Sequence, residues 1–328
     1  MTTSILKKIQ NIANEEVFFF KDYNGKNIYT KVWYPPKKDN IKGIIQIAHG
    51  LGETAEYYEE FANFFRKDGY AIYLNEALGH GRTAGDIHDL NYKCNAGDAG
   101  TDGLNHMVED LKILTDNIKD KYPDKKIFLI GHSLGSVISQ IYAYKYGYGI
   151  NGIICTGAIS ELDEKRFEYL LQIARREMEK RGRLEPSVDI FNALFGNLND
   201  KFKPARTEFD WITSDKKLLK ESLESPYANI SFNVGFYFDF INALKDRSEK
   251  NNIKNIPKDL PVFFLSGSDD PFIDNGKGIK ELFNIYKEQG LKDISFNLYE
   301  GKRHSILRET NRYLVFKDIL DWINIHWI

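Results

Sequence analysis

Residues 126–142 read KIFLIGHSLGSVISQIY, and this stretch decides the fold that we expect. Its first five residues predict a buried strand, because the apolar run 127–130 follows Lys126, and apolar residues from Val137 onward recur at helical spacing. Between them stands Gly131-His132-Ser133-Leu134-Gly135, the G-x-S-x-G pattern of a nucleophile elbow in its strand–turn–helix setting. The serine of such an elbow occupies a strained backbone conformation, so its flanking positions must lack bulk. The pattern predicts that Ser133 is a nucleophile, the alternative being a serine that only caps the helix.

Short apolar runs on either side of the elbow predict the rest of a sheet. Strands are expected at 17–20, 27–34, 43–48, 70–74, 126–130, 151–156, 261–265 and 294–299. Amphipathic helices are expected at 57–67, at 104–118 with Asp102 as a candidate cap, and at 311–327. Strands that alternate with helices predict an α/β fold, with a mostly parallel central sheet and helices on both faces. The polar residues 1–16 are expected to form a short helix.

The alternation of strands and helices stops between about 158 and 244. This segment is charged and helical over 165–181 and then rich in aromatic residues. We predict a helical cap at 158–245, inserted into a core made of 1–157 and 246–328, and the alternative is a run of connecting helices. The cap aromatics expected to roof the site, unless they only form the cap's own core, are Phe191, Phe195, Trp211, Phe232, Phe236 and Phe238.

A serine at its ordinary pKa needs a base and a carboxylate to become a nucleophile. The loop after the expected seventh strand carries Asp269 and Asp270, and the loop after the eighth carries His304. Both loops leave the carboxyl ends of strands, where Ser133 also lies, so the chain order Ser, Asp, His fits a catalytic triad. The other histidine after the elbow is His326, which falls in the last helix. His304 is therefore the predicted base.

An oxyanion hole needs two backbone N–H groups, one after the nucleophile and one from the loop after an earlier strand. Leu134 follows the serine, and Leu51 is the best candidate in the glycine-rich loop 48–53. Each such donor lowers the barrier by about 3–4 kcal/mol. A dinucleotide site is the alternative use of a glycine-rich loop, but the G-x-G-x-x-G pattern is absent after Ala48.

The remaining histidines are expected to have structural roles. His132 adjoins the nucleophile on a sharp turn, where neighbouring side chains diverge, and His49 and His80 are expected to tie loops by hydrogen bonds. The sequence has no H-x-x-x-H pattern, and its two cysteines, Cys94 and Cys155, form no CxxC pair. It therefore predicts no metal site and no disulfide framework. Cysteines that form no disulfides are typical of the reducing cytoplasm.

Composition excludes several classes of protein. The 328 residues are 42% hydrophobic and 28% charged, which excludes an intrinsically disordered chain. The formal net charge is −2, so the basic excess of a nucleic-acid-binding protein is absent. No apolar run approaches the roughly 20 residues that span a bilayer, and residues 1–16 lack the apolar core of a secretory signal. We expect a cytoplasmic protein, and its oligomeric state stays open.

With these motifs the sequence resembles the α/β-hydrolase superfamily, and within it the monoacylglycerol lipase, lysophospholipase and serine-aminopeptidase-like branch. The resemblance extends from about residue 17 to the C-terminus and includes 206–211, which resembles a stretch in the cap of bacterial lysophospholipase-like members. It rests on five motifs in family order, His49-Gly50-Leu51-Gly52-Glu53, Gly79-His80-Gly81-Arg82-Thr83, Gly131-His132-Ser133-Leu134-Gly135, Gly267-Ser268-Asp269-Asp270-Pro271 and Glu300-Gly301-Lys302-Arg303-His304.

The resemblance implies a role for individual residues. It assigns the nucleophile to Ser133, the acid to Asp270 and the base to His304. It also assigns the two oxyanion amides to Leu51 and Leu134. It also implies a small lipid or ester substrate, no cofactor, and contact with a membrane surface that is at most transient and made through the cap. One departure is that Asn75 or Glu76 stands where the family usually has Asp, which bears on loop tethering rather than on the reaction.

The leading hypothesis is hydrolysis of a monoacylglycerol or lysophospholipid through an acyl-enzyme on Ser133, because an aromatic-rich cap favours an apolar acyl chain. The alternatives are a small-ester esterase, an aminopeptidase, and a non-catalytic ligand-binding protein that keeps the fold. An aminopeptidase would need acidic cap residues to hold the substrate amine. The candidates for that role are Glu161, Asp163, Glu164 and Glu168.

Overall fold

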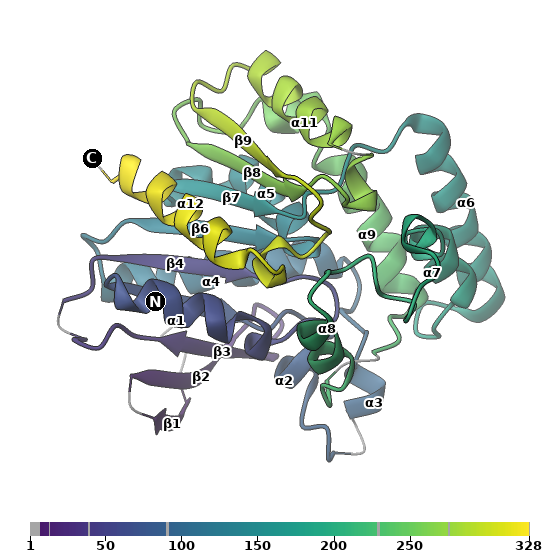
Figure 1. Ribbon diagram of the computed structural model, residues 1–328. Helices are drawn as coiled ribbons and strands as arrows, with labels where there is room; N and C mark the ends of the chain where they lie inside the picture. The colour runs from purple at the N-terminus through teal and green to yellow at the C-terminus, as the bar shows by residue number, and fades with distance from the viewer. Residues whose placement is uncertain are drawn as a thin grey trace.

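The computed structural model describes residues 7–12, 14–38, 40–89, 92–227, 230–274 and 276–327, and over these ranges nine strands form one central sheet (Figure 1). The strand order is β1-β2-β3-β5-β4-β6-β7-β8-β9. Neighbours from β5 onward in that order are parallel, whereas β1, β2 and β3 pair antiparallel and β3 is antiparallel to β5. The strands are β1 Lys7–Ile12, β2 Glu15–Lys21, β3 Asn27–Trp33, β4 Gly43–Ala48, β5 Tyr70–Asn75, β6 Ile127–His132, β7 Gly152–Thr156, β8 Val262–Gly267 and β9 Ile294–Tyr299.

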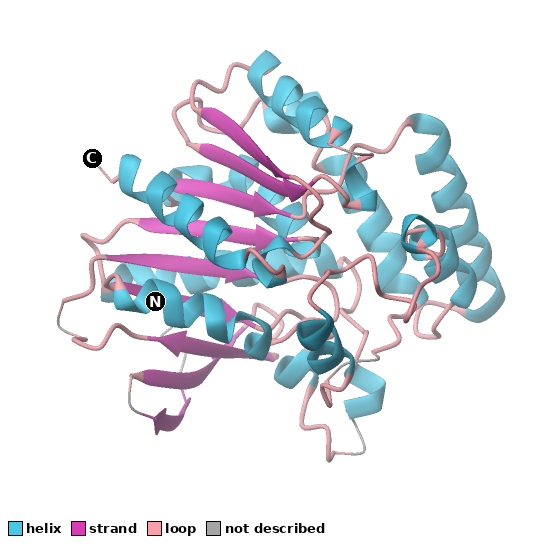
Figure 2. Cartoon of the chain, in the orientation of Figure 1, coloured by secondary structure: helices cyan, strands magenta, loops and turns pink. Residues whose placement is uncertain are grey.

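Helices cover both faces of this sheet (Figure 2). Helices α1 (Glu59–Lys67) and α12 (Arg312–Ile325) pack on one face, and α4 (Gly103–Lys121), α5 (Leu134–Tyr146) and α11 (Lys277–Glu288) pack on the other. The predicted mostly parallel sheet with helices on both faces is therefore confirmed. The other helices are α2 Gly81–Ala84, α3 Tyr92–Asn95, α6 Glu164–Arg181, α7 Val188–Phe195, α8 Lys216–Leu223, α9 Val234–Asp246 and α10 Lys250–Ile253.

Short 3-10 turns complete the secondary structure of the described ranges. They are η1 Ala55–Tyr58, η2 Gly147–Gly149, η3 Asp200–Phe202, η4 Pro271–Ile273 and η5 Ile306–Arg308. Two of them, η4 and η5, lie on the loops that follow β8 and β9. These are the loops on which the sequence places the acid and the base of the predicted triad.

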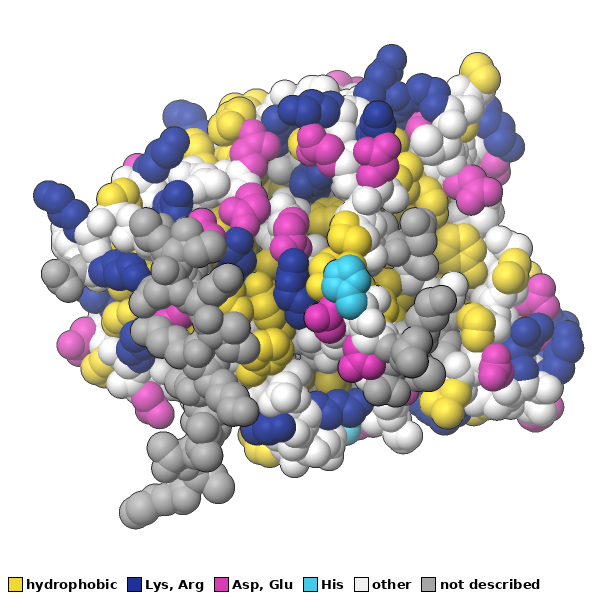
Figure 3. All heavy atoms as spheres, turned by 90° about the horizontal axis from the view of Figure 1, so that it is seen from below, with side chains coloured by type: hydrophobic (Ala, Val, Ile, Leu, Met, Phe, Trp, Pro, Cys, Tyr) yellow, Lys and Arg dark blue, Asp and Glu magenta, His cyan; other side chains and the backbone are white. Residues whose placement is uncertain are grey.

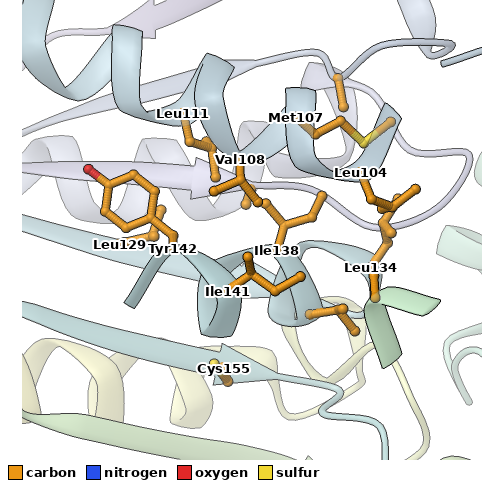
Figure 4. Close-up of a cluster of buried hydrophobic side chains, with 14 of the residues drawn as sticks. Leu104, Met107, Val108, Leu111, Leu129, Leu134, Ile138, Ile141, Tyr142 and Cys155 are labelled. Carbon is orange, nitrogen blue, oxygen red and sulfur yellow. The ribbon is translucent and has the colours of Figure 1, made fainter. Parts of the chain in front are cut away.

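The core beneath the elbow is formed by α4, α5 and the sheet (Figure 4). Helix α4 presents apolar residues at i, i+3, i+4 and i+7, from Leu104 to Leu111, to the buried face of α5. That face carries Ile138, Ile141 and Tyr142, none of which is more than 2% exposed. Burial of each large apolar side chain contributes about 1.5–3 kcal/mol. This packing fixes α5, and with it the turn that precedes it.

The helix predicted for residues 1–16 is wrong over the part that the structure describes. Residues 7–12 form β1, which pairs antiparallel with β2. The register shifts between Lys8 and Gln10, as in a β-bulge, which adds one residue to a strand. Ile9 and Ile12 stand three apart, so the spacing resembles that of a helix and the bulge hides the alternation of a strand. Residues 1–6 and 13 lie outside the described ranges.

Helix α4 begins in a different way from the prediction. Asp102 occupies the N-cap position with φ 57° and ψ 33°, and its side chain makes no capping hydrogen bond. The Gly103 N–H donates instead to Asp239 Oδ2 at 3.1 Å. Asp239 lies on α9, 136 residues further along the chain, so a local sequence pattern could not have indicated this contact.

The segment predicted as a cap contributes α6, α7, α8 and α9, which lie beyond the carboxyl ends of the central strands (Figure 1). Helix α6 contacts both α7 and α9, and it confirms the helix predicted over 165–181. Helix α9 also packs on α4 and α5, which joins this group to the core. Because α9 ends at Asp246, the predicted boundary between 245 and 246 falls at the end of a helix.

Charged side chains of both signs share the surface. In Figure 3, Lys and Arg side chains lie among Asp and Glu side chains over the face seen from below. This mixture agrees with the formal net charge of −2. Within the described ranges, every helix is too short or too polar to cross a membrane.

Candidate active site

Ser133 stands on a strained turn between β6 and α5. Its backbone has φ 53° and ψ −114°, a conformation that L-residues rarely adopt and that costs on the order of 1–3 kcal/mol. A Cβ on Gly131 would lie 2.2 Å from the Gly135 carbonyl oxygen, and a Cβ on Gly135 would lie 1.9 Å from the Ala48 carbonyl oxygen. Both positions therefore require glycine, as the sequence predicts.

His304 bridges Ser133 and Asp270. Its Nε2 lies 2.8 Å from Ser133 Oγ, and its Nδ1 lies 2.9 Å from Asp270 Oδ2. A carboxylate acceptor at Nδ1 fixes the proton on that nitrogen, so Nε2 is free to accept the serine proton. His304 is 3% exposed and Asp270 is 1% exposed, so the hydrogen bond between them is shielded from solvent. The structure thus brings together the three side chains predicted for the triad.

Asp269 and Asp270 are neighbours in the chain but have different partners. Asp270 Oδ1 accepts a hydrogen bond from the Phe272 N–H at 2.9 Å, and Oδ2 accepts one from the Ser266 hydroxyl at 3.2 Å. These bonds hold the carboxylate in the orientation that meets the histidine. Asp269 pairs instead with Lys201 at 2.7 Å near the surface. Asp270, and not Asp269, faces the base.

The two predicted oxyanion amides belong to residues that line the same cavity as the nucleophile. Leu51 and Leu134 share this lining with Ser133. Within the described part of the chain, neither the Leu51 nor the Leu134 N–H has a backbone acceptor. Glu53 accepts a hydrogen bond from the Gly50 N–H at 2.7 Å, which holds the loop that carries Leu51. Two such donors are suited to a negatively charged oxygen.

His49 and His80 tie loops by hydrogen bonds, as the sequence predicts. His49 Nε2 accepts from the Ala77 N–H at 2.8 Å, and its Nδ1 lies 2.8 Å from the Gly50 carbonyl oxygen. His80 Nδ1 lies 2.9 Å from the Leu78 carbonyl oxygen. Burial lowers the pKa of both imidazoles, that of His80 to about 3. Both rings are therefore neutral at pH 7.

His132 lies beside the base without taking its place. Its Nδ1 lies 3.0 Å from Thr156 Oγ1, and its Nε2 lies 3.0 Å from the Ser305 hydroxyl oxygen. The two imidazole rings of His132 and His304 are 5.1 Å apart. Burial lowers the pKa of His132 to about 4, so at neutral pH it carries no charge that would oppose a proton on His304.

A cavity of about 650 Å³ opens onto the nucleophile. Ser133 and His304 line it together with the loop around Leu51. Its volume lies in the range of small-molecule sites, and most of its wall comes from the segment predicted as a cap. The apolar and aromatic residues of that segment in the wall are Ile159, Phe191, Phe195, Ala205, Phe209, Trp211, Ile212, Leu219, Leu223, Ile230, Phe232, Tyr237 and Phe240.

Four of the six aromatic residues predicted to roof the site line this cavity, and two do not. Phe191, Phe195, Trp211 and Phe232 are the four. The prediction is wrong for Phe236 and Phe238. Phe236 is fully buried, with its ring 4.5 Å from that of Phe232, and Phe238 packs against the core. The helical turn of α9 directs successive aromatics to different sides, which composition alone does not show.

The acidic residues considered for binding an amine do not line the cavity. The Asp163 side chain caps α6, and Glu164 pairs with Lys245 at 2.7 Å. Glu161 and Glu168 are likewise absent from the lining in the described ranges. None of these four carboxylates therefore faces the cavity that opens onto Ser133.

Among the described residues, no cysteine side chain lines this cavity. Cys155 is a free, buried thiol, and burial raises its pKa to about 12. The side chain of Cys94 lies outside the described residues. Over the ranges that the structure describes, no group of three or more His, Cys, Asp or Glu side chains is placed so that it could hold a metal ion.

Comparison with known proteins adds to this geometry. The family model described as serine aminopeptidase, S33, matches residues 39–311, a range that covers most of the chain and every residue of the site above. The chain belongs to this family. It is similar to the monoglyceride lipase of Mus musculus, with 24% identity over 324 residues, or 96% of this chain and 92% of that one. It is also similar to the monoacylglycerol lipase of Mycolicibacterium smegmatis, with 21% identity over 307 residues, or 94% of this chain and 96% of that one.

Solved structures of other proteins share the fold. A thermostable carboxyl esterase from Bacillus coagulans, solved in complex with glycerol, superposes with a TM-score of 0.87 at 25% identity and covers 97% of this chain and 100% of that one. The α/β-hydrolase fold predicted from the sequence is confirmed. So is the predicted place in the monoacylglycerol lipase branch.

The stretch 206–211 holds the histidine loop of this serine aminopeptidase family member, a contact that sequence reasoning missed. The Trp211 ring lies 5.2 Å from the His304 ring, and the His304 N–H donates to the Trp211 carbonyl oxygen at 3.3 Å. Asp210 accepts a hydrogen bond from the Thr207 hydroxyl at 2.7 Å, which folds the stretch on itself. The only sign of this stretch in the sequence was its resemblance to a family motif. Such a resemblance does not show which residues the motif contacts.

Glu76, one of the two residues that stand where the family usually has Asp, tethers the loop after β5. It is fully buried, it pairs with Arg82 at 2.7 Å, and it accepts a hydrogen bond from the Ala55 N–H at 3.1 Å. These contacts tie the residues after β5 to the start of η1. The departure from the usual residue therefore leaves this loop anchored.

Proposed function

We propose that the protein is a serine hydrolase that cleaves carboxylic esters, with monoacylglycerols or lysophospholipids as its substrates. The observation that carries the proposal is the hydrogen-bonded series Ser133, His304 and Asp270 at a cavity with aromatic walls. A serine beside such a base attacks carbonyl carbon, and an apolar cavity takes up an acyl chain. The names of the similar proteins, monoglyceride lipase and carboxyl esterase, support the same reaction class.

In the first half of the proposed reaction, His304 Nε2 removes the proton of Ser133 as Oγ attacks the ester carbonyl carbon. Asp270 keeps the imidazole in the required tautomer and stabilises the imidazolium that forms. The N–H groups of Leu51 and Leu134 donate hydrogen bonds to the carbonyl oxygen as it becomes negative. His304 then gives its proton to the departing alcohol, and the acyl group stays on Ser133 as an ester.

Water completes the proposed reaction. His304 removes a proton from a water molecule, whose oxygen attacks the acyl carbon of the acyl-enzyme. The same two amides stabilise the second negatively charged intermediate. When the carbon–oxygen bond to Ser133 breaks, His304 returns the proton to Oγ and the carboxylic acid leaves. The cycle uses no metal or organic cofactor.

The proposal divides the chain into a core of 1–157 and 246–328 and a cap of 158–245. The cavity wall supports this division, since most of its apolar side chains come from the cap. Leu184 and Val188, 73% and 70% exposed, lie on the cap and support a transient contact with a lipid surface. A cytoplasmic location and the absence of a nucleic-acid partner belong to the same proposal.

A hydrolysis panel tests the proposed function. It spans an acetyl ester, a medium-chain monoacylglycerol, a lysophospholipid and an aminoacyl amide, for the wild type and for Ser133→Ala and His304→Ala. We expect ester hydrolysis by the wild type, weak amide hydrolysis, and loss of nearly all activity in both variants, with the double variant hardly worse than either. The exposed residues Ser231 and His88 provide matched controls, Ser231→Ala and His88→Ala, that should keep full activity.

Covalent labelling separates an enzyme from a binding protein that keeps the fold. A serine-directed phosphonate should label the wild type at Ser133 and leave Ser133→Ala unlabelled. A folded Ser133→Ala variant that retains more than a few per cent of activity would contradict the assignment. Cleavage of the amide in preference to every ester would contradict the substrate class.

A further inference from the structure

A single buried guanidinium lies where the cap segment leaves and rejoins the core. Arg247 follows the last residue of α9 and is fully buried. Its Nη1 donates to Gln140 Oε1 at 3.1 Å, and its Nη2 donates to the carbonyl oxygens of Ile159 and Ser160 at 2.7 Å and 2.8 Å. Its Nε is buried without a hydrogen-bond partner among the described residues.

The partners of Arg247 are unusual for a buried cation. Buried charges are normally paired with a charge of opposite sign, because leaving water costs more than neutral acceptors return. The three acceptors of Arg247 are an amide and two carbonyl oxygens, all uncharged. Burial lowers the pKa of Arg247, and the nearby Glu161 opposes this only through space. Stability alone gives no reason for a guanidinium here, since apolar residues would fill such a site at less cost.

Arg247 and its partner Gln140 join four parts of the molecule: the start of the cap, the chain just after the cap, α5 and α11. Ile159 and Ser160 are the second and third residues of the cap segment, and Arg247 lies just past its end. Gln140 is on α5, the helix that Ser133 begins, and the Tyr286 hydroxyl of α11 donates to the same Gln140 Oε1 at 3.1 Å. One side chain thus connects the entry and the exit of the cap to the nucleophile helix.

The same contacts reach the wall of the cavity and the acid loop. Ile159, whose carbonyl oxygen Arg247 holds, lines the cavity. The Ser160 N–H donates to the Phe272 carbonyl oxygen at 3.0 Å, two residues after Asp270. The Phe272 ring lies 5.0 Å from the His304 ring. A shift of the cap root would therefore move Ile159, which is part of the wall, directly. It would reach the reacting atoms only indirectly, through Phe272 and through Trp211 of the cap.

We propose that Arg247 is a positioning residue that clamps both ends of the cap to α5 and so sets the acyl-binding cavity for long-chain substrates. This inference rests on the proposed ester hydrolysis. It predicts a division between substrates. A short acyl ester needs Ser133, His304 and Asp270 but little of the cavity, whereas a long acyl chain needs the wall in place.

Arg247→Lys and Arg247→Met test the clamp against Arg176→Met, a matched control on the exposed side of α6. For acetyl ester we expect both Arg247 variants to keep kcat/KM within about twofold. For a C12 monoacylglycerol we expect KM to rise at least tenfold in Arg247→Met, with a smaller rise in Arg247→Lys and with kcat nearly unchanged. A residue that only stabilised the fold would alter both substrates equally.

Hydrogen exchange measured by mass spectrometry provides a readout that needs no substrate. Exchange should become faster in peptides that cover 158–163 and 240–247 and should stay unchanged at the elbow. Equal losses for short and long esters, no loss for either, unaltered exchange at the cap root, or global unfolding of both Arg247 variants would each overturn the proposal. If the wild type cleaves no ester, the proposed function fails, while the exchange measurement still decides whether Arg247 clamps the cap.

Discussion

Asp270 is buried against His304, while the side chain of Asp269 is 33% exposed and pairs with Lys201. Asp270→Asn should keep the fold but lower kcat by about 10⁴-fold, because an amide no longer fixes the required imidazole tautomer. Asp269→Asn should change kcat less than about fivefold, because an exposed ion pair contributes little. Steady-state kinetics of the two purified variants check this pair. The reverse ranking would show that the wrong carboxylate has been assigned to the base.

Asp110 is a second residue whose burial leads to a specific prediction, here about how stability depends on pH. It lies on α4, is 1% exposed, and neither carboxylate oxygen has a hydrogen-bond partner among the described residues. Burial, with a further contribution from the charges of Asp22 and Glu109, raises its pKa to about 8, while Lys26 acts in the opposite direction. Its carboxyl group is therefore protonated in the folded protein at neutral pH.

The sign of the resulting pH dependence follows from linkage. The folded-state pKa of Asp110 lies above the unfolded value, so its contribution to stability is fully present below about pH 4 and is lost as the pH rises through about 8. Asp110→Asn, which cannot ionise, should gain thermal stability relative to the wild type between pH 6 and pH 9. Melting temperatures at these two pH values measure it, with the exposed Asp124→Asn as a control. A constant difference between variant and wild type at both pH values would refute the prediction.

At the scale of elements, the elbow depends on how closely α5 approaches β4. A methyl group on Gly135 would lie 1.9 Å from the Ala48 carbonyl oxygen, so the backbone of α5 or of β4 would have to move. Gly135→Ala should lower the free energy of unfolding by at least about 2 kcal/mol and remove most of the activity. Gly149→Ala should be nearly neutral, because its nearest neighbours are side-chain ends at 3.6 Å. Urea unfolding and ester hydrolysis of both variants provide the test, and a stable, active Gly135→Ala would disprove the packing argument.

The elements that sequence reasoning predicted are those whose signals are local. Buried strands such as β6 and β8 are continuous apolar runs, and the elbow carries its own glycines, so fold and triad order could be read directly. Strand β1 could not be predicted from the sequence, because its pairing with β2 and its bulge decide its conformation. The start of α4 could not either, because its N-terminal N–H is held by Asp239 from a distant helix. Where a partner far along the chain decides the structure, local propensity gives the wrong answer.

At the scale of the whole molecule, the sequence could predict where the reacting atoms lie but not the shape of the substrate cavity. Ser133, Asp270 and His304 follow the parallel strands β6, β8 and β9, so the topology brings them to one edge and the sequence could predict their meeting. The cavity wall comes from helices whose orientation is set by contacts such as those of Arg247 and Trp211. Composition could predict an aromatic cap, but it could not predict which aromatics face the substrate.

That wall determines the expected preference for acyl length. Each methylene buried in the cavity contributes up to about 0.8 kcal/mol, or about a fourfold gain in kcat/KM. We therefore expect kcat/KM to rise from acetyl to medium-length esters and to level off once the chain fills about 650 Å³. Triacylglycerols should be poor substrates, because one cavity of this size does not hold three chains.

A series of esters from C2 to C16 measures this preference, for the wild type and for two phenylalanine variants that differ in one respect. Phe195 lines the cavity, and Phe238 packs on the core without lining it. Phe195→Ala should flatten the rise for long chains and leave the acetyl ester unchanged, because only a long chain reaches the wall that it removes. Phe238→Ala should shift all esters alike, through stability alone. If kcat/KM is flat or falls from C2 upward and neither variant alters the profile, the cap aromatics only pack against one another. The substrate would then be a small ester, whose binding energy must come from the polar groups around Ser133.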